Sequence, residues 1–71
     1  MASKEVITRM KADIEYGLLN YELDLKVLRK KLVMVTDPEV TKIYTERIEQ
    51  IDIAKGALEE KLDILKAHKG E

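Results

Sequence analysis

The feature that most constrains the fold is one break in an otherwise helical sequence, the tetrapeptide TDPE at residues 36–39. Pro38 is the only proline in 71 residues. It restricts Asp37 to extended conformations, and because it lacks an N–H it suits the first turn of a helix. One helix therefore ends near residue 35 and another begins near residue 38. A connection this short makes the two helices antiparallel neighbours.

Two N-caps are possible for the second helix. Asp37 can cap it with Pro38 in the first helical position, or Thr36 can cap it with Glu39 as its capping-box partner. Either choice predicts one helical-hairpin domain over residues 1–71, with a helix at about 4–35, a turn at 36–38 and a helix at about 38–68.

Apolar residues on both sides of the break recur in steps of three and four. In the first half they are Ile7, Ile14, Leu18, Tyr21, Leu25, Leu28, Leu32 and Val35; in the second half they are Tyr44, Ile48, Ile51, Leu58, Leu62 and Leu65. These steps form heptads with a narrow seam. The segment YELDLKV at 21–27 alternates as a strand would, but the seam runs through it unbroken. The pattern predicts an all-α, coiled-coil-like antiparallel hairpin.

Two registers of this hairpin fit the heptads. One sets Ile14 near Leu58, and the other slides the second helix by about half a turn and brings Tyr21 opposite Lys55. Lys11 and Lys55 stand in seam positions where leucine is expected. Each either lays its methylene stem over the core with the ammonium at the edge, or sets register or oligomeric state as a polar seam residue can.

The first helix has more apolar side chains than one seam can use. On a helical wheel, a second stripe lies nearly opposite the seam, and a weaker one lies off the seam of the second helix. Because a surface helix needs one apolar stripe, a second stripe indicates a second partner. We expect self-association, most simply as a homodimer forming a four-helix bundle. The predicted interface residues are Tyr16, Leu19, Leu23, Val27, Met34, Ile43, Ile53 and Ile64.

Two glycines, Gly17 and Gly56, lie inside the predicted helices. A glycine in a helix interior costs about 1 kcal/mol relative to alanine. The two residues therefore either mark a place where another helix approaches closely, or are tolerated on a solvated face.

Residues for catalysis or metal binding are sparse. There is no cysteine, Ser3 lies at the N-terminal end, and His68, the only histidine, has Leu65 rather than a glutamate three residues before it. The Glu-x-x-His pattern of bundle metal sites is therefore missing. The many carboxylates lie mostly on charged helix borders. We expect no enzyme, no cofactor, no metal and no small-molecule substrate.

The second apolar stripe, with no chemistry beside it, favours a protein partner. Acids and bases are interleaved, with a net charge of −1, so no overall field favours nucleic acid or a membrane. We expect a non-enzymatic interaction module acting as regulator, inhibitor or assembly subunit, with a larger protein as a further partner. The alternative is an RNA- or DNA-binding hairpin dimer using the basic cluster at residues 26–31. No membrane span, signal peptide or disulfide is expected, which favours a cytoplasmic location.

Overall fold

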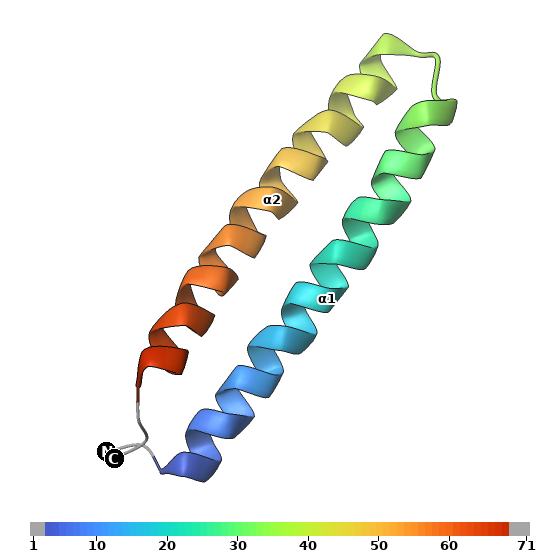
Figure 1. The fold of residues 1–71 in the computed structure, drawn as a ribbon. Coiled ribbons are helices and arrows are strands. Elements are labelled where there is room, and N and C mark those ends of the chain that lie inside the picture. Colours follow the sequence, from blue (N-terminus) through green and yellow to red (C-terminus); the bar gives the residue numbers. More distant parts are fainter. Residues whose placement is uncertain (1–2, 69–71) are drawn as a thin grey trace.

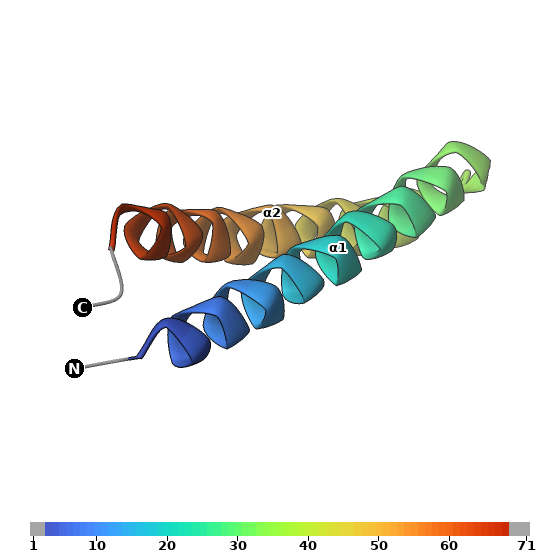
Figure 2. The same cartoon turned by 60° about the horizontal axis from the view of Figure 1, so that its bottom comes forward.

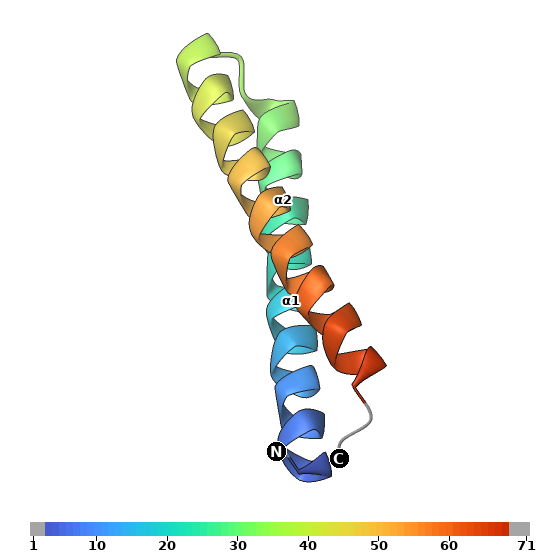
Figure 3. The ribbon, with the colours of Figure 1, turned by 90° about the vertical axis from the view of Figure 1, so that its left-hand side faces the viewer.

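The computed structural model describes residues 3–68, which form two long helices side by side (Figure 1). Helix α1 comprises Lys4–Met34 and helix α2 comprises Pro38–Ala67. They run antiparallel and cross at a shallow angle (Figures 2 and 3). The predicted all-α antiparallel hairpin is confirmed. Each helix ends one residue before the predicted position.

Both helices begin at a side-chain cap. The Ser3 hydroxyl accepts a hydrogen bond from the Val6 N–H at 3.3 Å, and the Asp37 carboxylate accepts one from the Glu39 N–H at 2.9 Å. Asp37 has the extended φ and ψ of −79° and 122° that a following proline requires. The cap of α2 is therefore Asp37 with Pro38 in the first turn, and not Thr36.

The helices meet along the predicted seam, which is the only place where side chains are removed from water among the described residues. Ile7, Leu25 and Leu62 are buried, with 4%, 3% and 9% of their surface exposed. The other predicted seam residues are half-buried. A two-helix seam leaves each helix with one side against its partner and the rest in water, so most of its core residues keep some exposure.

The register of the hairpin agrees with the second of the two predicted alternatives. A Cβ added to Gly17 would lie 3.1 Å from Cδ1 of Leu58, and the Lys55 ammonium lies 3.7 Å from the Glu22 carboxylate. The Leu58 contact places Lys55 opposite about residue 20, and the ion pair places it near residue 22. Both positions are closer to Tyr21 than to residue 17, where the first alternative would place Lys55.

The molecule is a thin rod of 54 × 15 × 12 Å. Its radius of gyration is 16.3 Å, whereas a compact domain of this length has about 11 Å. Its accessible surface is 5880 Å², against about 4,500 Å² for an ordinary folded monomer of the same mass. One chain alone thus leaves an unusually large part of itself in contact with water.

Candidate interaction surface

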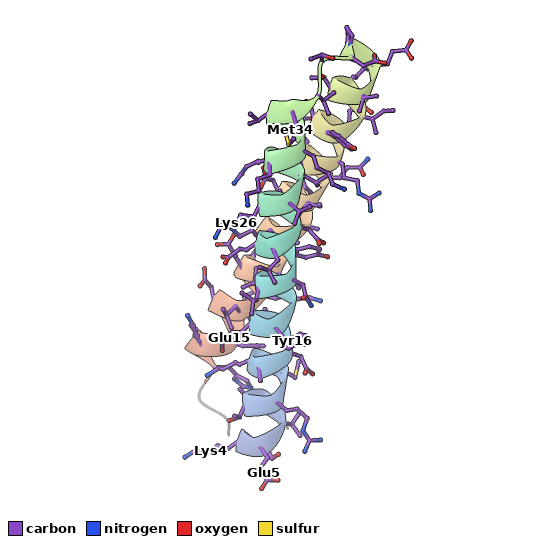
Figure 4. The ribbon with its side chains drawn as sticks, turned by 90° about the vertical axis from the view of Figure 1, so that its right-hand side faces the viewer. Lys4, Glu5, Glu15, Tyr16, Lys26 and Met34 are labelled. Carbon is purple, nitrogen blue, oxygen red and sulfur yellow. The ribbon has the colours of Figure 1, made fainter. Side chains whose placement is uncertain are left out.

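The side of α1 that points away from α2 carries a row of large apolar side chains, which we call the outer stripe. It consists of Ala12, Tyr16, Leu19, Leu23, Val27 and Met34, interrupted by Lys30. Tyr16 is 70% exposed, Met34 is 83% exposed, and Leu19, Leu23 and Val27 are each 52% exposed. Figure 4 looks onto this side of α1, with α2 behind it and Tyr16 and Met34 labelled on α1. The exposed fractions therefore agree with the helical wheel, which assigned these residues to a stripe opposite the seam.

The outer stripe has a different period from the seam. Ala12, Leu23 and Met34 are spaced by 11 residues, and so are Tyr16 and Val27. Eleven residues make three turns at about 3.67 residues per turn, close to the 3.6 of a straight helix, whereas the seam repeats every seven. The stripe therefore runs almost straight along α1, as a surface for another helix would.

Charged residues border the outer stripe on both sides, with an uneven distribution along the helix. One border carries Glu15, Glu22, Lys26 and Arg29, and the other carries Asp13, Asp24 and Lys31. All of them are exposed. Along each border, these acids precede these bases in the sequence.

The predicted interface residues do not all fall on one surface. Ile43, Ile53 and Ile64 are exposed, but they belong to α2. Ile64 lines a groove of about 370 Å³ near the ends of the chain, together with Met10, Asp13, Ile14, Leu58, Lys61 and Leu65. The five predicted residues on α1 are the ones that share a single row, which Lys30 interrupts between Val27 and Met34.

Three exposed large apolar side chains were not among the predicted interface residues. They are Val6, Met10 and Val33, with 47%, 45% and 87% of their surface exposed. On the wheel Val6 lies between the seam and the outer stripe, and Met10 lies at the edge of the seam, at the angle of Leu28. The proximity of Met10 to α2, in the groove that it lines with Ile64, follows from the pairing of the two helices.

The two seam lysines are half-buried. The side chain of Lys55 is 27% exposed and its ammonium reaches Glu22, which is 57% exposed, at the edge of the seam. This geometry is what a snorkelling lysine adopts, with the stem over the core and the charge at the surface. A role for Lys11 or Lys55 in register or oligomeric state stays a prediction.

The two glycines have different surroundings. Gly17 faces α2, where Leu58 leaves little room for a side chain, whereas nothing lies within 4 Å of a Cβ added to Gly56. Close helix approach within the hairpin therefore accounts for Gly17. Gly56 lies on an open face of α2.

The charged side chains of α1 and α2 meet in a groove lined by Glu22, Lys26, Arg29, Asp52 and Lys55. Within residues 3–68 no three histidine, aspartate or glutamate side chains are grouped to hold a metal ion. The bases Lys26, Arg29, Lys30 and Lys31 are all exposed, but consecutive residues point in different directions around a helix. The cluster is therefore spread rather than aligned on one face, which does not favour the nucleic-acid alternative.

No helix in the described range is long and apolar enough to cross a membrane. No family model matches the chain, and no curated protein or solved structure is similar to it at a significant level.

Proposed function

We propose that this chain is a non-enzymatic interaction module, a helical hairpin that self-associates through the outer stripe of α1 into a four-helix assembly, a flat bundle with the two α1 helices in the middle and the two α2 helices outside. It would act as a small regulator, inhibitor or assembly subunit. The observation that carries the proposal is the row of five large apolar side chains on the exterior of α1, interrupted only by Lys30 and each at least half exposed. Exposed apolar patches of this kind generally mark interaction sites.

The size of the surface supports pairing with a further helix. The five side chains leave roughly 600 Å² of surface in water, which is at the upper end for the largest patch on a monomer. A specific interface buries about 800 Å² on each partner. The outer stripe and the stems of its bordering side chains together come close to this area.

The thinness of the hairpin supports a second copy as the partner. A chain of 71 residues with only three buried residues in its described part has a small core, and domains of this size commonly gain stability by oligomerising. Pairing two outer stripes would convert α1 from a half-exposed helix into a central one. The sequence contains no cysteine, which suits a cytoplasmic setting for such a module.

The test places charge on the stripe and leaves the seam intact. We expect the wild-type chain to have twice the mass of one 8.2 kDa chain by light scattering, and a melting temperature that rises with protein concentration. The double variant Leu19→Glu/Leu23→Glu should be monomeric and melt at a lower temperature.

The matched control adds the same charge elsewhere. Thr45→Glu/Gln50→Glu changes two exposed polar residues of α2 and should keep the wild-type mass. If the stripe variant keeps the wild-type mass and stability as well, the outer stripe is not the self-association surface and the proposal is wrong.

A further inference from the structure

We propose that the second copy packs antiparallel on the first, with the two α1 helices in contact and a two-fold axis at Leu23. This inference rests on the proposed self-association and specifies its geometry. Three features of the outer stripe carry it: the sizes of its side chains, the position of its one charged residue, and the order of the charges along its borders.

Side-chain sizes match when the stripe is laid against itself in the reverse direction. With the axis at Leu23, each residue of one α1 faces the residue of the other α1 that lies the same number of positions from Leu23 in the opposite direction along the sequence. Leu23 then faces its own copy, Leu19 faces Val27, and the smallest residue, Ala12, faces Met34, the long flexible residue at the other end. Large residues against small ones allow two helices to interdigitate.

The same axis accounts for Lys30, the one interruption of the stripe. Lys30 is as far from Leu23 as Tyr16 is, so it faces Tyr16 of the second copy. Both side chains are exposed in the single chain. A lysine can lay its stem along an aromatic ring and place its ammonium over the ring face. Lys30 thus faces Tyr16, the one aromatic residue of the outer stripe, whose ring can hold an ammonium group over its face.

The border charges distinguish the two directions of packing. In an antiparallel pair each border faces the same border of the second copy. Glu15 then lies near Arg29, and Asp13 lies near Lys31, on both sides of the axis. A parallel pair would instead bring one border against the other at the same height. Glu15 would then lie near Asp13, and Arg29 near Lys31, so like charges would oppose each other.

The charges next to the axis do not discriminate between the directions. Asp24 would meet Asp24 of the second copy in the antiparallel pair and Glu22 in the parallel pair. An acid faces an acid in either case, and Lys26 lies near an acid in either case, Glu22 in the antiparallel pair and Asp24 in the parallel pair. The preference for antiparallel packing therefore comes from the outer charges at residues 13, 15, 29 and 31.

Disulfide trapping tests the direction, because the sequence has no cysteine of its own. Ala12→Cys and Met34→Cys are made as separate variants, then mixed and oxidised. The antiparallel pair joins residue 12 of one chain to residue 34 of the other. Neither variant alone should form a covalent dimer, since like residues would be about 33 Å apart along the helices. Leu23→Cys alone should form one readily.

The outcomes separate this inference from the proposed function. A chain that is monomeric by light scattering overturns both. A dimeric chain in which Ala12→Cys crosslinks with itself is parallel, and a dimeric chain in which none of the three positions crosslinks uses another surface. Either of these two results overturns the antiparallel arrangement and leaves self-association standing.

Charge reversal gives a second readout that needs no crosslink. Glu15→Arg should weaken the dimer by roughly tenfold, because each dimer contains two copies of the contact with Arg29. Adding Arg29→Glu to the same chain should restore the affinity. Parallel packing predicts the opposite sign for Glu15→Arg, since that change would remove a contact between acids. Glu60→Arg, at an exposed position on α2, is the control and should leave the affinity unchanged.

Discussion

The substitutions Gly17→Ala and Gly56→Ala should change the free energy of unfolding by different amounts, although both replace a glycine inside a helix by alanine. Alanine is favoured over glycine in a helix by about 0.8–1.0 kcal/mol. At Gly56 a new Cβ would meet nothing within 4 Å, so Gly56→Ala should gain the full amount. For a domain of this size, that corresponds to a rise of about 4–8 °C in melting temperature.

At Gly17 the same gain is opposed by a steric contact. The new Cβ would lie 3.1 Å from Cδ1 of Leu58, so Leu58 must shift by a few tenths of an ångström. Overpacking of this kind costs about 1 kcal/mol or more. Gly17→Ala should therefore change the free energy of unfolding by about zero, or lower it. In a Leu58→Ala background the contact is gone, and Gly17→Ala should again stabilise by about 1 kcal/mol.

The measurement is urea unfolding followed by far-UV circular dichroism, with all variants at one protein concentration because self-association would couple to folding. Equal stabilisation by Gly56→Ala and Gly17→Ala would refute the close contact between α1 and α2 at Leu58. A loss of stability on Gly56→Ala would show that another chain packs closely against the open face of α2.

Two further substitutions test the cap of α2 and the lysine in the seam. Asp37→Ala should lower the free energy of unfolding by about 0.5–2 kcal/mol because it leaves the Glu39 N–H without its acceptor, whereas Thr36→Ala should change it by less than about 0.5 kcal/mol; equal losses would mean that both residues cap the helix. Lys55→Leu should raise the free energy of unfolding by about 1 kcal/mol, since a half-buried leucine gains apolar burial while the ion pair with Glu22, at the edge of the seam, is worth little. Its mass by light scattering should stay that of the wild type, and a changed mass would assign Lys55 a role in oligomeric state.

The sequence by itself determined the two helices and the direction in which each side chain points. Pro38 marks the place where the chain reverses direction between the two helices. The spacing of the apolar residues fixes their angle around the helix axis. Residues such as Leu25 and Leu23 could therefore be assigned to the seam and the outer stripe before their exposure was known. These are local properties, because 3.6 residues per turn relates sequence position to angle without reference to any other part of the chain.

Only the tertiary structure decided the register, which is the position of α2 along α1, and the contacts that follow from it. A heptad seam presents similar apolar residues at every repeat, so sliding α2 along α1 keeps apolar side chains in contact and the pattern cannot select a register. The contact of Leu58 with Gly17 and the pairing of Lys55 with Glu22 show which register the hairpin adopts. The same pairing gives Gly17 and Gly56 different surroundings and brings Met10 beside Ile64. A contact between two helices depends on the angle of each residue around its helix axis and on its position along that axis. Sequence periodicity supplies only the angle.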